Sequence, residues 1–152
     1  MLERLLSLFH PGTTVTPLPK ADEQHALGAL LVRAAKIDRA YLFEEVEEID
    51  HVLAALYDLN PVDAAKMRAR CEKLESAMPD TAELAEVLHQ HIADDHLEDA
   101  VRALWSVVFS DGNEAPAEDA LLHEIEAILG VSPERARELH DEEMAKSGRF
   151  PS

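Results

Sequence analysis

Apolar side chains recur every three or four positions along most of the chain, which is the spacing of helices that each bury one face. From Asp22 to Asp38 the shared face holds Leu27, Leu30, Leu31, Ala34 and Ile37. From Phe43 to Tyr57 the inward positions are Val46, Ile49, Val52, Leu53 and Leu56. No stretch alternates in the manner of a strand, and β-branched residues are sparse. The pattern predicts an all-α protein.

Helix caps and prolines divide the rest of the chain into five further helices. Asn60 and Ser132 each precede a proline, which combines a capping side chain with a residue suited to the first turn. Asp80 or Thr81, and then Asp94 or Asp95, begin two helices between these points. Gly130 stands where a left-handed C-terminal cap belongs. The expected helices cover residues 61–78, 81–92, 94–110, 116–129 and 133–148.

The two halves of the chain align with each other at an offset of 73 residues, so that Leu31 falls on Leu104 and Glu45 on Glu118. With a shift of one residue, the motif at 59–61 also falls on that at 131–133. We therefore expect two similar three-helix units, joined by the helix at 81–92. Their core is expected to contain Leu31, Ile49, Leu53, Leu104, Trp105, Leu122 and Ile125.

The first 20 residues differ from the rest of the chain. Residues 1–10 have the spacing of a short amphipathic helix, and residues 11–20 contain the prolines, glycine and threonines of a linker. The start lacks the apolar run and cleavage site of a signal peptide. We expect this helix to dock on a helical domain that spans residues 21–148. No segment approaches 18 uncharged apolar residues, so no membrane-spanning helix is expected.

Charge narrows the range of partners. The 152 residues include 31 acidic and 14 basic side chains, which gives a formal net charge of −17. This charge repels nucleic acid and anionic lipid, and it favours cations or the basic surface of a protein partner. A single cysteine, Cys71, cannot form an internal disulfide and suits the reducing cytoplasm. The sequence leaves the oligomeric state open.

The turn at residues 110–118 is the best-defined polar motif. Asp111-Gly112 ends one helix, and Pro116 begins the next, which makes Glu118 its third residue. From that position a carboxylate can accept a hydrogen bond from the amide of the capping residue. At 100° per residue, Glu118 lies on the stripe of Leu122, Ile125 and Leu129. A carboxylate on an apolar stripe must be hydrogen-bonded, paired or bound to a metal.

Two interpretations of this acidic turn follow. In the first, Asp111 and Glu118 cap the helix ends, are satisfied by backbone amides and are the least exposed acids of the chain. In the second, a divalent cation such as Ca²⁺ or Mg²⁺ is bound by hard oxygen ligands from Asp111, Glu114, Glu118 and Asp119. The first half offers a weaker counterpart with Asp38 and Glu45. The turn is not an EF-hand, because Asp111 directly precedes Gly112.

The motifs resemble those of the TerB family of tellurite-resistance proteins, which is related to the N-terminal region of the co-chaperone DjlA. The resemblance covers about residues 23–144 and is carried by Asp111-Gly112, Pro116, Glu118 and the run at 129–133, with residues 35–45 as a first acidic turn. It implies an all-helical fold of about seven helices and a metal-binding or partner-binding role without established catalysis. Arg39 stands where the family's first turn has Asp-Gly. The His-Pro-Asp tripeptide of a J domain is missing, so a full co-chaperone role does not follow.

Two functions from different classes remain. The first is a non-enzymatic, cytoplasmic, stress-linked adaptor of the TerB type with no certain cofactor. The second is a small helical metalloenzyme that uses the pairs Glu48/His51 and Glu86/His89 or a local cluster at the junction of two helices. That cluster consists of His89, His91, Asp94, Asp95 and His96.

Overall fold

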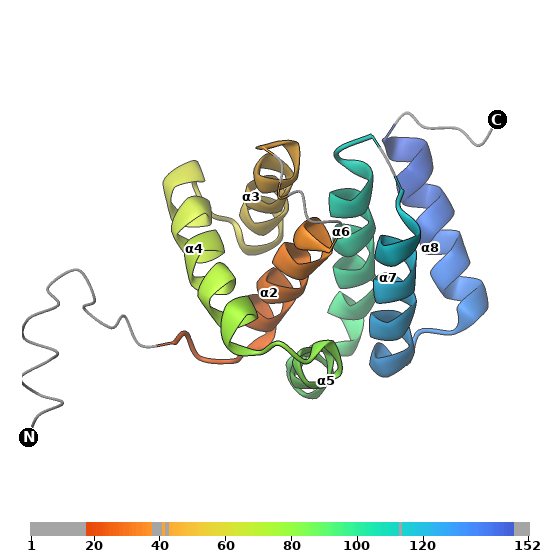
Figure 1. The fold of residues 1–152 in the computed structure, drawn as a ribbon, viewed down its shortest axis with the longest axis horizontal. Coiled ribbons are helices and arrows are strands. Elements are labelled where there is room, and N and C mark those ends of the chain that lie inside the picture. Colours follow the sequence, from red (N-terminus) through yellow and green to blue (C-terminus); the bar gives the residue numbers. More distant parts are fainter. Residues whose placement is uncertain (1–17, 38–40, 42, 113, 148–152) are drawn as a thin grey trace, which may run out of the picture.

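The computed structural model describes residues 18–37, 41, 43–112 and 114–147, and within them the chain is helical and contains no strand. The expected helix at residues 1–10, most of its linker, and Asp38 lie outside the described residues. Seven α-helices and one 3-10 turn follow in order (Figure 1). They are α2 (Glu23–Lys36), α3 (Phe43–Tyr57), α4 (Pro61–Ala77), α5 (Thr81–His91), η2 (Asp94–His96), α6 (Leu97–Phe109), α7 (Pro116–Leu129) and α8 (Pro133–Lys146).

The predicted helix boundaries are confirmed to within a few residues. The side chain of Asn60 accepts a hydrogen bond from the amide of Asp63 at 2.8 Å, and Ser132 accepts one from Arg135 at 3.2 Å. Gly130 ends α7 with a φ of 81°. The predicted helix start at Asp94 or Asp95 is instead the 3-10 turn η2, and the α-helix begins three residues later.

Helix α2 lies at the centre of the molecule and contacts α3, α4, α5 and α6. Every residue from Ala26 to Ala35 is buried, so α2 is covered on all sides rather than on the one face that its apolar spacing predicted. Figure 1 shows α3 and α4 on one side of α2, and α6, α7 and α8 on the other. All seven residues that the sequence predicted as core are buried. Ile37 and Leu56, at the ends of their apolar stripes, are each 37% exposed.

Gly28 lets α4 approach α2 closely. A Cβ at this position would collide with Sγ of Cys71 on α4. Further along α2, the buried Arg33 donates from Nε to Oε2 of Glu75 at 3.1 Å and from Nη2 to the main-chain oxygens of Glu75 and Met78. The end of α4 is thereby joined to α2, because Arg33 neutralises a buried carboxylate and satisfies carbonyls that the helix leaves open.

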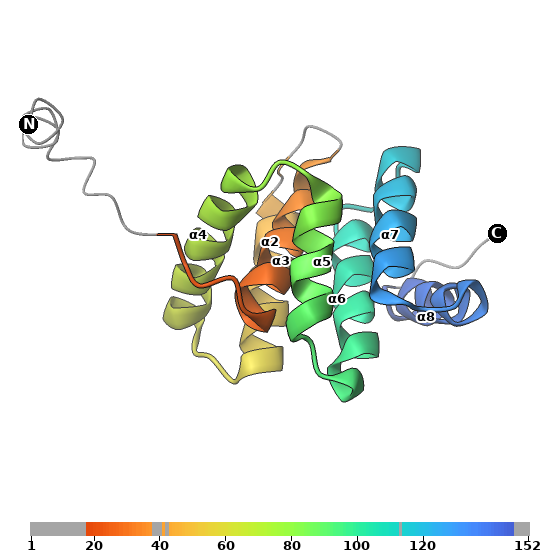
Figure 2. The ribbon, with the colours of Figure 1, turned by 90° about the horizontal axis from the view of Figure 1, so that it is seen from below.

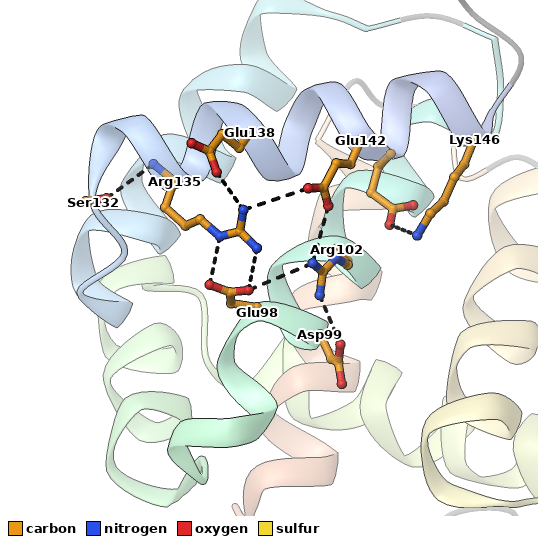
Figure 3. A network of polar contacts seen from close by, with 9 residues as sticks. Glu98, Asp99, Arg102, Ser132, Arg135, Glu138, Glu142 and Lys146 are labelled. Carbon is orange, nitrogen blue, oxygen red and sulfur yellow. Dashed lines mark hydrogen bonds and ion pairs between the residues drawn. The ribbon is translucent and has the colours of Figure 1, made fainter.

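Helix α8 is attached to α6 by charged side chains (Figure 3). Arg135 of α8 binds the carboxylate of Glu98 on α6 with two hydrogen bonds, of 2.8 and 2.7 Å. Arg102 of α6 reaches Glu142 of α8 at 3.3 Å. These hydrogen bonds raise the pKa of Arg135, and the same guanidinium lowers the pKa of Glu98. The bidentate pair sets the direction of α8, although exposed pairs of this kind contribute little to overall stability.

Figure 2 shows α7 from the side and α8 nearly end on, so these two consecutive helices cross at a wide angle. Among the described residues, no helix combines the length and apolar character that crossing a membrane requires. The division at residue 20 and the relationship between the two halves stay predictions.

Candidate functional site

A cleft of about 580 Å³, which we call the α7–α8 cleft, lies between helices α6, α7 and α8. Its lining comes from Trp105 of α6, from α7 and α8, and from Glu114 in the chain between α6 and α7. Because α8 crosses α7 at a wide angle, the two helices cannot close over each other along their lengths. The cleft gathers Glu114, Asp119, His123, Glu126, His140 and Asp141, with Arg137 as the only basic side chain other than the histidines in its lining.

His140 lies between two carboxylates. Its Nε2 is 3.0 Å from Oε2 and 3.1 Å from Oε1 of Glu114, and its Nδ1 is 2.9 Å from Oδ1 of Asp141. Burial by itself lowers the pKa of an imidazole, but here the hydrogen bonds to Asp141 and Glu114 outweigh it and raise the pKa. The ring also packs edge-on against Trp105, with the ring centres 4.6 Å apart. His140 is therefore held in one orientation, and its protonated form is favoured.

Asp119, one turn from the start of α7, faces Glu114 across the cleft. The pKa of Asp119 is raised to about 6. Burial is the largest cause, followed by the hydrogen bond with Glu114 and the repulsion between the two carboxyl groups. Its Oδ1 is buried and accepts no hydrogen bond from the described residues. A positive group near Asp119 would favour its charged form.

Glu126 lies deeper, and its side chain is only 3% exposed. The indole Nε1 of Trp105 donates to its Oε2 at 3.0 Å, whereas Oε1 has no hydrogen-bond partner among the described residues. Burial raises the pKa of Glu126, against the opposing effect of the bond from Trp105. Asp119 and Glu126 therefore both bring a buried carboxylate oxygen without a donor to the lining of one cleft.

The capping role that the sequence predicted for Glu118 is confirmed. The side chain is fully buried, and its Oε1 accepts from the amide of Ala115 at 2.9 Å. Ala115 has no side-chain acceptor, so only the glutamate half of a capping box is formed. Glu45 at the start of α3 is also fully buried, as its place on the apolar stripe predicted.

The prediction that Asp111 is among the least exposed acids is wrong. Asp111 is half-buried in the turn after α6, where its side chain stays at the edge of the core. The least exposed acids among the described residues are Glu45, Glu75, Glu118, Glu126 and Glu143.

Of the four predicted cation ligands, the structure brings two into the cleft, Glu114 and Asp119. Glu118 is used as a helix cap, and Asp111 lies outside the lining. Within residues 18–37, 41, 43–112 and 114–147, no group of three or more His, Cys, Asp or Glu side chains is arranged to hold a metal ion. Glu45 lies in this part of the chain, whereas its expected companion Asp38 does not.

The predicted histidine cluster at the junction of α5 and α6 is dispersed over the surface. His96 contacts Glu23 of α2 at 3.1 Å, His91 contacts the main-chain oxygen of Val87 at 2.9 Å, and His89 faces Glu86 at 3.6 Å. Asp94 and Asp95 lie in the exposed 3-10 turn η2. Each histidine is thus engaged with a different neighbour rather than with a shared centre.

The sequence reasoning missed His123, Glu126 and His140. A signal for the first two was present, because Asp119, His123 and Glu126 follow the spacing i, i+4, i+7, which places them on one stripe of α7. That stripe borders the apolar stripe on which Glu118 lies. His140 could not be found in this way, because only the crossing of α8 brings it to the stripe.

The chemistry available in the cleft is the recognition of positive charge. Four carboxyl groups and two imidazoles line a partly buried space, and the pKa values of Asp119, Glu126 and His140 are raised. A positive group that entered the cleft would be attracted to these carboxylates more strongly than in water, because burial lowers the local dielectric constant. It would also relieve the cost of the two carboxylate oxygens that lack donors.

Comparison with known proteins gives one family. The model of the family described as tellurite resistance protein TerB matches residues 24–141, which is most of the chain and includes all of the helices from α2 to α7 except the first residue of α2. Neither the curated proteins nor the solved structures contain a significant match to the chain.

Proposed function

The chain belongs to the TerB family of tellurite resistance proteins, and we propose that it is a non-enzymatic binding module that recognises a cationic partner in the α7–α8 cleft. Membership of this family associates the helical domain with tellurite resistance. In this proposal the domain acts in the cytoplasm as an adaptor and carries out no chemistry on tellurite itself.

One observation carries the proposal: the buried carboxylate oxygens of Asp119 and Glu126 line the same cleft without a hydrogen-bond donor. Buried polar atoms in folded proteins almost always have a partner, so two such atoms in one cleft favour a ligand that supplies donors. The net charge of −17 supports a cationic ligand further, because it attracts positive partners over long distances and speeds their association.

A divalent cation is a second form of the same proposal. Asp111, Glu114, Glu118 and Asp119 supply the oxygen atoms that Ca²⁺ and Mg²⁺ prefer, provided that Glu114 and Glu118 leave their present partners His140 and Ala115. Calorimetric titration with each ion tests this form. Capping alone predicts no saturable heat, and we expect weak binding or none.

No observation favours the metalloenzyme alternative at the junction of α5 and α6, where the histidines contact separate neighbours. Elemental analysis of the purified protein tests that alternative directly. Stoichiometric iron, zinc or manganese would support it.

A complementation experiment tests the proposal in cells that lack their own copy of the protein. We expect the unchanged protein to restore growth on tellurite and the cleft variant Glu114→Gln/Asp119→Asn/Glu126→Gln to fail. A control removes the same number of charges from exposed positions, with Glu83→Gln, Glu124→Gln and Glu134→Gln. Equal growth with the cleft variant and the control, both shown to be folded by circular dichroism, would contradict the proposal.

A further inference from the structure

The carboxyl group of Glu126 is an unusual feature for the interior of a helical domain. Glu126 is only 3% exposed. Its Oε2 accepts a hydrogen bond from Trp105, whereas its Oε1 has no donor among the described residues. A buried carboxylate oxygen without a donor destabilises the folded state, and such atoms are rare in folded proteins. Glu126 is one of the residues that line the α7–α8 cleft, so a ligand in the cleft is the nearest source of a donor.

The predicted repeat indicates that the fold does not require this polar pair. When the two halves of the chain are aligned at 73 residues, Trp105 corresponds to Val32 and Glu126 to Leu53. Val32 and Leu53 are both fully buried. In this alignment, the first half has two apolar side chains at the positions where the second half has an indole and a carboxylate. A ligand therefore explains the indole–carboxylate pair better than packing does.

The remaining lining indicates what the donor is attached to. Apolar side chains of Ala127, Val131, Pro133 and Ala136 line the cleft together with the acids. A bare metal ion makes no use of such surface, and no arrangement of three metal-binding side chains exists among the described residues. An ammonium group on an aliphatic stem fits both the acidic and the apolar side chains of the lining. The ammonium group has three donors for the carboxylate oxygens, and the methylene groups of the stem can pack on the apolar side chains.

We propose that the α7–α8 cleft binds a lysine side chain of a basic partner protein, with the ammonium group donating to Oε1 of Glu126 and Oδ1 of Asp119. This inference rests on the proposed function and names the chemical group that the site recognises. A protein partner, rather than a free amine, accords with the charge of −17, which steers a large basic surface toward the chain. Arg137 at the lining is the one side chain that opposes the approach of a cation at all pH values.

The chain contains a single tryptophan, so the indole Nε1–H of Trp105 gives one identifiable signal in the spectrum of the ¹⁵N-labelled protein. This proton lies on the hydrogen bond to Glu126 and reports directly on the carboxylate. The probe is the capped peptide acetyl-Gly-Lys-Gly-amide. The controls are the same peptide with acetyl-lysine and the same peptide with norleucine, which retains the stem and lacks the charge.

We expect the lysine peptide to shift the indole signal in a saturable way and the two neutral peptides to leave it unchanged. Glu126→Gln keeps the shape of the side chain and an acceptor for Trp105 and should weaken binding about tenfold or more, as expected for the loss of one charge-assisted contact. Asp119→Asn, nearer the surface, provides a second test if Glu126→Gln does not fold. Glu124→Gln, exposed on the same helix, should bind as the unchanged protein does.

Three outcomes overturn the inference: no shift with the lysine peptide, an equal shift with the norleucine peptide, or equal binding by Glu124→Gln and by both cleft variants. A shift with Ca²⁺ alone, in the absence of any with the lysine peptide, would assign the cleft to a metal ion instead. These failures are distinguishable from failure of the proposed function. If the cleft variant still loses growth on tellurite while the peptide does not bind, the cleft is functional and its ligand is not lysine.

Discussion

Trp105 and Glu126 form the deepest polar contact of the α7–α8 cleft, with the indole Nε1 donating to Oε2 of the carboxylate at 3.0 Å. The two residues come from different helices, α6 and α7, and each is nearly inaccessible to solvent. The contact satisfies the indole completely, since its nitrogen can only donate one hydrogen bond. It satisfies the carboxylate only in part, because Oε1 is buried and has no hydrogen-bond partner among the described residues.

The first prediction concerns the stability of this pair. Trp105→Phe should destabilise the protein by about 2–4 kcal/mol, because it leaves a cavity and removes the one donor that the buried carboxylate of Glu126 has among the described residues. Combining it with Glu126→Leu should recover a large part of this loss, since a buried polar group is replaced by an apolar one of similar size. Urea unfolding of the two single variants and the double variant measures the coupling. Strictly additive losses would show that the two side chains do not depend on each other.

The second prediction concerns the cap at the start of α7. Glu118→Ala should cost about 1–3 kcal/mol, because the amide of Ala115 loses its acceptor and the buried stripe gains a gap. Glu124→Ala, on the exposed side of the same helix, should change stability by less than about 0.5 kcal/mol. The free energy of unfolding in urea separates the two variants. Equal, small effects would exclude a structural role for Glu118.

Local sequence signals account for how well the helices could be predicted. A cap such as Asn60 beside Pro61, or a glycine such as Gly130 that accepts a positive φ, acts within one turn and can be read from neighbouring residues. The buried position of Glu118 was predicted from its angular position on the helix at residues 116–129 alone. These features need no knowledge of how the helices pack.

The cleft could not be predicted in the same way, because it depends on contacts between residues far apart in the chain. His140 reaches Glu114 because α8 packs across α6, where Arg135 binds Glu98. The sequence also left the angle between α7 and α8 undetermined. Trp105 was correctly predicted as core, yet its polar edge, which the hydrophobic pattern does not register, contacts the most buried acid of the cleft.

The third prediction concerns the close approach of α2 and α4. Gly28→Ala should destabilise the protein by about 1–3 kcal/mol, because the added methyl group meets Sγ of Cys71 and overpacking outweighs the gain in helix propensity. Cys71→Ala in the same chain should relieve part of this cost. Thermal unfolding of the single variants and the double variant tests the coupling, and a Gly28→Ala variant as stable as the unchanged protein would contradict the close contact.

The fourth prediction is that affinity for a lysine peptide increases as the pH rises through about 6. The pKa of Asp119 is about 6, so the carboxylate that receives the ammonium group is mostly neutral below this value and charged above it. His140, whose pKa is raised, loses its positive charge as the pH increases, and this acts in the same direction. The raised pKa of Glu126 adds a further loss of charge at low pH. The charged or titratable groups that line the cleft are Glu114, Asp119, His123, Glu126, Arg137, His140 and Asp141.

The measurement is the dissociation constant of the lysine peptide between about pH 5 and about pH 7.5, followed by the indole signal of Trp105. If Asp119 must be ionised, affinity should fall about tenfold for each pH unit below its pKa. Asp119→Asn should bind more weakly above about pH 6, approach the unchanged protein below it and lose most of this dependence. Arg137→Ala should bind more tightly because it removes a like charge. Affinity that stays constant or increases toward low pH would show that these carboxyl groups do not receive the cation.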